Sequence, residues 1–418
     1  MKQSILMATK AFLILVAIYL SLGLVAYLVP DAPVVRHIKQ TVDNGDLCED
    51  YPKAIIVNRP DTQDPYTLDN FTDALILNQV LHLRSEGLRG ILLMARHDEG
   101  IHQYNNLIQS LRGSTEGRTI YYPRYWHGST FLARIMLALT SYAGVRYFLY
   151  LLSSLLLLWC LMRLWQAAGK AVALVFAFGL LAVDLFVMQF SLQFVQVLLI
   201  ACGAACWLTR PRAAEGHRPS LLFFIVGSLT AFLDLLTVPT ITLGLPLVVL
   251  VALRREGDLR RGITLAVATA LWWAAGYALT WVAKWGLATL LTDINTFSDA
   301  FDQGARWSEG SGSYLADAFS TTASYTHWKY LFLALVALVA AALFRRRRKA
   351  WPLAVQYALV ALIPLAYYLL MARPTAHHAW FAYRALATSA IALLMLVASQ
   401  VDWQACRAWF TAKVRKQQ

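Results

Sequence analysis

The sequence predicts an all-α polytopic membrane protein with about ten transmembrane helices, in which a large outer first loop carries juxtamembrane amphipathic helices. The first observation is composition: 58% of the residues are hydrophobic and 15% are charged, a more apolar balance than soluble globular domains have. The second is that the apolar residues form continuous runs of about 20 residues, the length of a bilayer-spanning helix. A transmembrane β-barrel is excluded, because its strands would alternate apolar and polar residues over about 10 residues, whereas these runs are continuously apolar. These observations exclude a soluble enzyme, a fibrous protein and a disordered chain.

The apolar runs give the predicted transmembrane helices in chain order. They cover residues 11–30, 145–165, 171–187, 191–208, 219–236, 238–253, 262–283, 329–344, 351–371 and 382–400. The first run follows Lys2 and Lys10, as the apolar part of a signal peptide would. Its length, together with Tyr19, Tyr27 and Pro30, favours a retained transmembrane helix instead.

Basic residues between the runs set the expected orientation. With the N-terminus inside, the cytoplasmic side carries Lys2, Lys10, Arg163, Lys170, Arg210, Arg212, Arg218, Arg254, Arg255, Arg260, Arg261, the run 345–349, Arg407, Lys413, Arg415 and Lys416. Only Glu215, Glu256, Asp258 and Asp402 oppose them. This asymmetry is the one that the positive-inside rule describes. We therefore expect both termini in the cytoplasm. We attribute the formal net charge of +13 to this topology. The expected partner is the membrane, and no nucleic acid is expected to bind.

The same assignment divides the chain into segments. They are a first transmembrane helix (1–30), an outer loop with amphipathic helices (31–144), a transmembrane bundle (145–283), a second outer loop (284–328), C-terminal transmembrane helices (329–400) and a basic amphipathic cytoplasmic tail (401–418). Every histidine except His217 falls on the outer side or near its boundary. Chemistry or polar-ligand binding is therefore expected at the outer face.

Carboxylates in the first outer loop are the first candidates for that chemistry. Asp69 and Asp73 are spaced i and i+4 on a predicted helix, so both lie on one helical face. Two like charges there need a cation, a hydroxyl ligand or solvent, although an acidic first turn is also what the helix dipole favours. Asp98 and Glu99 lie between His97 and His102, whose spacing is not that of a zinc site, so no metal site is expected.

One part of a family resemblance is the aromatic turn of residues 121–128, Tyr-Tyr-Pro-Arg-Tyr-Trp-His-Gly. An amphipathic stretch over 129–137 follows, then Gly144, and Arg146 opens the next run. With the first span and the long acidic outer loop, these features resemble the polyprenyl-phosphate-sugar-dependent glycosyltransferases of the C-type membrane fold, such as aminoarabinose, arabinosyl and mannosyl transferases. The resemblance covers roughly residues 10–165 in the order of its features. The chain is also similar to uncharacterised bacterial polytopic membrane proteins.

The resemblance implies an inverting transfer of a sugar from a polyprenyl-phosphate donor to a lipid-linked or surface glycan acceptor, on the outer face of the bacterial cytoplasmic membrane. A carboxylate would act as general base toward the acceptor hydroxyl, and the phosphate can leave without an acid. Asp69 or Asp73 would be that base. In the family the base usually follows the first span closely, whereas Asp69 lies about 40 residues beyond it. Asp98 and Glu99 therefore remain alternatives. No tightly bound cofactor and no divalent metal are expected.

Cations near the late spans are the candidate ligands of the donor phosphate. The set comprises Arg384, Arg373, Lys284, His377 and His378. Arg384 should lie inside the outer boundary of the last span, where a cation is costly unless it is paired. The alternative is that it snorkels to the headgroups. Candidate acceptor or pocket residues are Arg124, Tyr125, His127, Asp98 and Glu99.

Two other functions remain open, a transporter or flippase of lipid-linked glycans and a polymerase or ligase of such glycans. The cytoplasmic loops are short and the chain has no GxxxxGK[ST] motif, which excludes an ATP-driven pump. A transporter should carry ionisable residues at mid-membrane. Here Asp184 and Asp234 instead stand at the ends of two predicted spans, which favours the enzyme.

Two cysteines test the predicted topology. A variant that keeps Cys48 as its only cysteine should react with a membrane-impermeant thiol reagent in intact cells, because Cys48 is expected outside. A matched variant that keeps only Cys406 should react only after permeabilisation. Labelling of Cys406 but not Cys48 in intact cells would reverse the orientation.

Overall fold

The computed structural model describes residues 2–47, 68–344 and 350–415, and it shows an all-α membrane protein with one small sheet. Cys48 and the basic run 345–349 lie outside the described residues. Within the described ranges, the helical segments long and apolar enough to span a bilayer are Gln3–Leu28, Tyr142–Ala168, Leu259–Leu291, Trp351–Leu370 and Ala379–Ala398. The other predicted spans correspond to apolar helices of 10–17 residues, which are shorter than a straight crossing of the bilayer.

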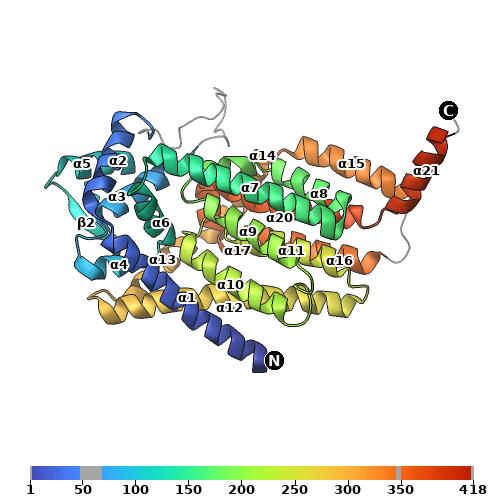
Figure 1. Ribbon diagram of the computed structural model, residues 1–418, viewed down its shortest axis with the longest axis horizontal. Coiled ribbons are helices and arrows are strands. Elements are labelled where there is room, and N and C mark those ends of the chain that lie inside the picture. Colours follow the sequence, from blue (N-terminus) through green and yellow to red (C-terminus); the bar gives the residue numbers. More distant parts are fainter. Residues whose placement is uncertain (1, 48–67, 345–349, 416–418) are drawn as a thin grey trace.

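Most of these helices run roughly along the long axis of the molecule (Figure 1). The first group comprises α1 (Lys2–Leu28), α7 (Tyr142–Ala168), α8 (Lys170–Leu181), α9 (Val195–Leu208), α10 (Arg218–Leu233), α11 (Thr240–Arg254) and α12 (Leu259–Leu291). The later group comprises α15 (Trp328–Phe344), α16 (Trp351–Ala361), α17 (Ile363–Leu370) and α20 (Leu386–Ala398). The predicted span 171–187 ends earlier than expected, because Asp184 takes a left-handed backbone conformation and the 3₁₀ turn η2 (Leu185–Phe190) follows it.

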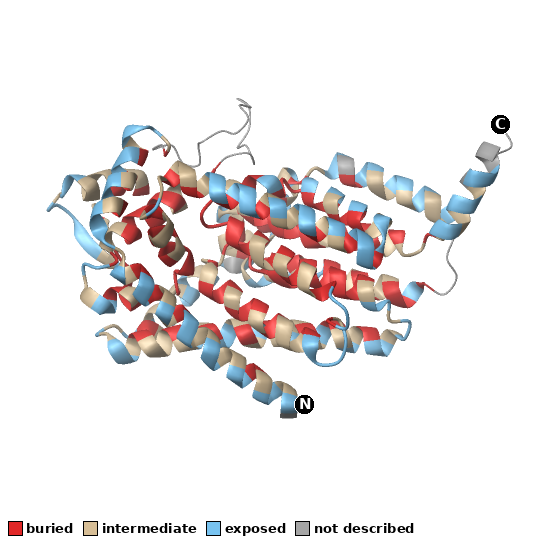
Figure 2. Cartoon of the chain, viewed as in Figure 1, coloured by how far each residue is buried: buried red, intermediate tan, exposed pale blue. Residues whose placement is uncertain are grey.

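Burial distinguishes the centre of the bundle from its lipid-facing rim. Every residue of α11 from Thr240 to Ala252 is buried, so α11 has no face left for lipid or water. By contrast, α7 exposes a band of large apolar side chains that includes Phe148, Leu155 and Trp159. Figure 2 shows this contrast between buried inner helices and exposed outer faces. Exposed apolar surface of this extent fits contact with lipid.

Helices α10 and α12 cross at glycines. A Cβ atom on Gly227 would lie 2.0 Å from the Trp273 carbonyl oxygen, and one on Gly276 would lie 2.0 Å from the Phe224 carbonyl oxygen. Such close backbone approach is how small residues pack transmembrane helices. Next to this crossing, the Tyr19 hydroxyl of α1 lies 2.9 Å from the Ser228 hydroxyl, which lies 2.7 Å from that of Thr280.

The segment between α1 and α7 forms a compact N-terminal loop unit, which we define as residues 31–47 and 68–141. It contains α2 (Asp31–Asp43), α3 (Asn70–His82), η1 (Gly87–Arg89), α4 (Gly90–Leu93), β1 (Ala95–Asp98), α5 (Gln103–Arg112), β2 (Arg118–Tyr121) and α6 (Gly128–Leu137). Strands β1 and β2 pair antiparallel, with Ala95 opposite Tyr121 and Asp98 opposite Arg118. The expected helices near 67–75 and 101–111 are present as α3 and α5.

The buried side chain of Arg134 on α6 holds this unit to α1. Its Nε donates to the Ala26 carbonyl at 2.9 Å, and its Nη1 donates to the Val80 carbonyl of α3 at 2.6 Å. Its Nη2 donates to the Val29 carbonyl at 2.9 Å and to the carboxylate of Asp31. One guanidinium thus joins the end of α1, the start of α2, and α3.

The later loops contribute short helices that return toward the N-terminal loop unit. They are α13 (Thr296–Ser308), η3 (Ser311–Tyr314), α14 (Leu315–Tyr325), α18 (Ala372–His377), α19 (Ala379–Ala382) and η4 (Tyr383–Ala385). The predicted amphipathic tail is helical as α21 (Trp403–Arg415). It lies at the end of the molecule away from the N-terminal loop unit (Figure 1).

Candidate functional site

The two predicted carboxylates lie buried at the start of α3, where Asp69 and Asp73 are each 2% exposed. Asp69 is the N-cap residue, and its Oδ1 accepts the Thr72 backbone N–H at 2.9 Å. The capping role therefore accounts for one of its oxygens. Its other oxygen, Oδ2, is buried and accepts no hydrogen bond from the described part of the chain. A buried acceptor of this kind is costly unless a ligand satisfies it.

Asp73 is held by hydroxyl and amide donors from distant segments. The Tyr142 hydroxyl of α7 donates to its Oδ2 at 2.6 Å. The Leu192 backbone N–H and the Ser191 hydroxyl, which lie between η2 and α9, donate to its Oδ1 at 3.2 and 3.5 Å. Both oxygens of Asp73 are thus engaged, whereas Asp69 keeps one oxygen for a ligand.

Burial shifts the acidity of both groups. Removal from water raises the pKa of Asp69 to about 6, against the smaller lowering effects of its hydrogen bonds from Thr72 and of the Arg384 cation. Burial also raises the pKa of Asp73 to about 7; the Tyr142 hydroxyl and the Arg146 cation lower this pKa, and the charge of Asp69 raises it. Carboxylates with pKa values near neutrality suit proton transfer at physiological pH.

Arg384 is the cation that acts on Asp69, as Arg146 acts on Asp73. It lies in η4, is 1% exposed, and influences the pKa of Asp69 electrostatically. Its guanidinium carbon lies 5.1 Å from the ring centroid of Tyr383 and 6.0 Å from that of Phe194. The side chain is therefore enclosed in the protein, so snorkelling to the headgroups does not describe it.

A second buried acid holds the backbone turn that carries Arg384. The Tyr383 hydroxyl donates to Oδ2 of Asp184 at 3.1 Å, and His327 Nε2 lies 2.8 Å from the same oxygen. Because Asp184 stands on the turn between α8 and η2, these contacts tie η4 to segments about 200 and 60 residues away in the chain.

A separate group, which we call the Lys284 cluster, contains Lys284, Arg124, Tyr125, Trp126 and His127. The Lys284 Nζ is buried, donates to the Leu92 carbonyl at 2.8 Å, and lies 5.7 Å from the Trp126 ring centroid. Lys284 and Arg124 both act electrostatically on His127. The structure thus brings Lys284, predicted as a donor ligand, together with three of the predicted acceptor residues, Arg124, Tyr125 and His127.

His127 is neutral in this cluster. Burial, and then the nearby cations Lys284, Arg124 and Arg96, lower its pKa to about 3. Its Nε2 lies 2.8 Å from the Tyr122 carbonyl, which makes that nitrogen the donor, while its buried Nδ1 has no hydrogen-bond partner among the residues that the structure describes. Nδ1 is therefore available to accept a hydrogen bond from a ligand.

Arg124 is paired on one side. Its Nη1 lies 2.8 Å from both carboxylate oxygens of Asp299 on α13, and its guanidinium carbon lies 4.7 Å from the Tyr122 ring centroid. The Tyr125 ring packs 5.0 Å from that of Trp281 on α12. This arrangement attaches the second outer loop and α12 to the N-terminal loop unit.

The alternative base residues, Asp98 and Glu99, hold the loop unit together. Asp98 Oδ1 accepts from the Asn106 amide at 2.8 Å. Glu99 Oε1 accepts from the Ser114 hydroxyl at 2.6 Å and lies 2.9 Å from His97 Nε2. The hydrogen bonds from Ser114 and His97 lower the pKa of Glu99, which makes it a weaker base than Asp69.

The remaining predicted donor residues form a third group at the second outer loop. Arg373 Nη1 donates to the carbonyls of Arg306 and Glu309 at 2.7 and 3.2 Å. The ring of His377 packs 5.2 Å from that of Tyr314, and the ring of His378 packs 5.3 Å from that of Phe381. Phe381 lies 5.0 Å from Phe194, beside the Arg384 guanidinium. A ladder of rings therefore connects His378 with Arg384.

Several residues of the site were not among the predicted site residues. They are Tyr142, Arg146, Ser191, Leu192, Asp184 and Tyr383 from the carboxylate site, and Arg96 from the Lys284 cluster. Their local sequence carries no signal, since each gains its role from a contact far along the chain. Among the described residues, no group of three or more His, Cys, Asp or Glu side chains is arranged to hold a metal ion.

No protein-family model matches the chain, and neither the curated proteins nor the solved structures include a significant match.

The raised pKa values of Asp69 and Asp73 predict a pH-dependent stability. From pH 3.8, the ordinary pKa, to about 7, the folded protein binds more protons at these sites than the unfolded chain does. Their contribution to the free energy of unfolding therefore falls as the pH rises through this window. Asp73→Asn removes one of these groups, so it should flatten the dependence and stabilise the protein at pH 8. Thermal unfolding of the purified protein between pH 5 and 8 measures this.

Glu116→Gln, at an exposed position of the same loop unit, is the matched control and should leave the profile unchanged. An Asp73→Asn profile that superimposes on that of wild type would show that Asp73 does not titrate in this range.

Proposed function

We propose that this protein is a membrane glycosyltransferase that moves a sugar from a polyprenyl-phosphate donor to a lipid-linked or surface glycan acceptor, with inversion at the anomeric carbon. The observation that carries the proposal is the buried Asp69 carboxylate, which keeps one oxygen without a donor among the described residues and lies within the electrostatic influence of Arg384. A base and a phosphate-binding cation are the two groups that this chemistry needs.

Each group has a defined part in the proposed reaction. Asp69 Oδ2 accepts the proton of the acceptor hydroxyl while the hydroxyl oxygen bonds to the anomeric carbon of the sugar. The bond between that carbon and the phosphate oxygen breaks, and the polyprenyl phosphate leaves with the electron pair. Arg384 balances the negative charge that develops on the phosphate. Asp73 positions the start of α3, because both of its oxygens are already engaged.

The Lys284 cluster supports an acceptor site. Lys284 has no acidic partner among its described contacts, and His127 offers an unengaged Nδ1. Tyr125 and Trp281 add aromatic faces of the kind on which sugar rings stack. A glycan or lipid acceptor that carries an anionic group would suit these residues. No tightly bound cofactor is part of the proposal.

The distribution of charge supports a site on the outer face of the bacterial cytoplasmic membrane. Described basic residues gather at the α21 end of the molecule, and they include Lys170, Arg210, Arg254, Arg260 and Arg407. By the positive-inside rule this end is cytoplasmic, which puts the carboxylates at the opposite, periplasmic end. We further propose about ten spans, in which short helices such as α8 cross together with adjoining turns such as η2.

The carboxylate assignment predicts a loss of transfer in Asp69→Asn. The substitution removes the charge but keeps an N-cap side chain, so α3 should persist. Loss of a general base should lower kcat by about 10²- to 10⁴-fold. Asp73→Asn should lower kcat less, because Asp73 acts only by positioning α3. The assay follows sugar transfer from a short-chain polyprenyl-phosphate donor to an acceptor extract by protein in detergent micelles.

Asp302→Asn, an exposed carboxylate of α13, is the matched control and should transfer normally. Detergent micelles contain no bilayer to cross, so transfer there would not be explained by a flippase. Full activity in both carboxylate variants, together with a loss of activity in Asp98→Asn or Glu99→Gln, would assign the role of general base to Asp98 or Glu99.

The donor assignment predicts weaker binding in Arg384→Ala. A buried charge-assisted contact is worth about 1.5–3 kcal/mol, so donor affinity should fall roughly ten- to hundredfold. Arg384→Lys should recover only part of the wild-type donor affinity, because a bidentate guanidinium is replaced by a point charge. The measurement is the Kd of a polyprenyl-phosphate sugar for wild type and each variant. Arg306→Ala removes an exposed cation at the same end as a control, and equal affinity in all four proteins would exclude Arg384 from the donor site.

A further inference from the structure

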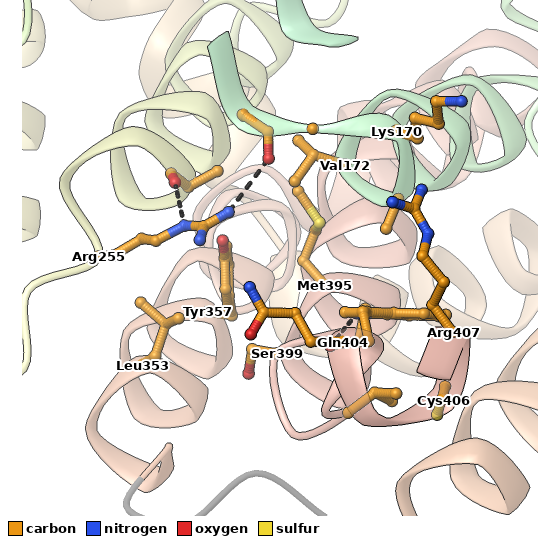
Figure 3. A pocket seen from close by; sticks show the side chains of 17 residues that line it. Lys170, Val172, Arg255, Leu353, Tyr357, Met395, Ser399, Gln404, Cys406 and Arg407 are labelled. Atoms are coloured by element: carbon orange, nitrogen blue, oxygen red, sulfur yellow. Dashed lines mark hydrogen bonds between the residues drawn. The ribbon is translucent and has the colours of Figure 1, made fainter. Parts of the chain in front are cut away.

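A cavity of about 670 Å³ lies at the α21 end of the molecule, far from the carboxylates. Figure 3 shows it between the start of α8, the end of α11, the helices α16 and α20, and the start of α21. None of its lining residues takes part in the candidate functional site. Its volume lies in the range of small-molecule binding sites.

The polar part of the cavity is cationic. Lys170, Arg255 and Arg407 line it, and none of the described lining residues is an aspartate or a glutamate. Within the described residues, no ion pair forms on any of these three cations. Figure 3 shows the guanidinium of Arg255 beside the hydroxyl of Tyr357, with the amide of Gln404 facing the same space.

Backbone contacts fix Arg255 in this position. Its Nε donates to the Ala252 carbonyl at 3.3 Å, and its Nη2 donates to the Ala168 carbonyl at 3.1 Å. The Ala168 contact joins the end of α11 to the end of α7. These bonds use two faces of the guanidinium and leave Nη1 for a ligand. Two backbone hydrogen bonds thus hold the exposed Arg255 side chain at the cavity.

The rest of the cavity wall is apolar. Val172, Leu353, Met395, Val401 and Trp403 contribute to it. Trp403 begins the amphipathic helix α21, and its indole N–H donates to the Ala398 carbonyl at 3.1 Å, which ties α21 to the end of α20. An apolar wall next to a cluster of cations matches a molecule with an anionic head and an apolar tail.

We propose that this cavity binds the headgroup of an acidic phospholipid of the cytoplasmic leaflet, with its phosphate against Arg255, Lys170 and Arg407. Basic pockets between transmembrane helices on the cytoplasmic side select anionic headgroups in this way. The choice of leaflet rests on the topology proposed above, whereas the choice of an anionic lipid rests only on the cavity. The proposal is independent of the glycosyltransferase assignment.

Lipid binding by the full-length protein in detergent tests the proposal. The probes are dioctanoyl phosphatidylglycerol, dioctanoyl phosphatidylcholine and inorganic phosphate, and bound lipid is counted by native mass spectrometry. Wild type should bind the glycerol lipid at least tenfold more tightly than the choline lipid. Each basic residue contributes roughly fivefold to such binding, so the triple variant Lys170→Gln/Arg255→Gln/Arg407→Gln should bind it about 100-fold more weakly.

Two variants make the result specific. The matched control Arg210→Gln/Arg218→Gln/Arg260→Gln removes the same charge at the same end but outside the cavity, and it should bind as wild type does. The double variant Lys170→Gln/Arg407→Gln keeps the backbone contacts of Arg255 and should bind the glycerol lipid about 20-fold more weakly than wild type does. It keeps the proposal testable even if the triple variant fails to fold.

Equal affinity for the two lipids, or an equal loss in the control, would overturn the proposal. Inorganic phosphate that binds wild type as tightly as the glycerol lipid, and that the triple variant no longer binds, would assign the cavity to a soluble anion instead. Because the readout is binding, these outcomes do not depend on sugar transfer.

Discussion

The guanidinium of Arg134 is the constraint on which the candidate site depends. It is fully buried and donates to three backbone carbonyls and to Asp31, so its charge is satisfied away from water. Removing a partner from such a buried network typically costs about 3–5 kcal/mol, because the groups left behind are unsatisfied. The contact joins α6 to α3 and to the end of α1. The position of α3 relative to the first membrane helix therefore follows from this one side chain.

Further polar contacts extend this constraint into the membrane bundle. Asp73 on α3 accepts from Tyr142 of α7 and from the backbone before α9. Asp184, on the turn between α8 and η2, accepts a hydrogen bond from Tyr383, the neighbour of Arg384. Segments far apart in the chain thereby converge on Asp69. Burial of this carboxylate raises the pKa of Asp69, and its Oδ2 has no hydrogen-bond donor among the described residues.

Periodicity and composition predicted much of the fold because these signals are local. The apolar runs, the helices at α3 and α5, and the helical tail all follow from residues that are neighbours in sequence. Helix length was predicted less well: α8 ends at Leu181, because Asp184 adopts a left-handed conformation to reach His327 and Tyr383. The strands β1 and β2 were missed, since each has only four residues, too few for an alternating pattern.

The sequence by itself determined that the chain belongs in a membrane, how its charge is distributed between loops, and that Asp69, Asp73 and Arg384 are exceptional residues in their surroundings. Only the tertiary structure decided how they group. In the structure, Arg384 acts electrostatically on Asp69, and Lys284 and Arg124 act on His127. Asp98 and Glu99 accept hydrogen bonds within the loop unit. The physical reason is that the burial and hydrogen bonding of residues such as Asp73 and Lys284 depend on partners more than 50 residues away in the chain, and no local pattern encodes such pairings.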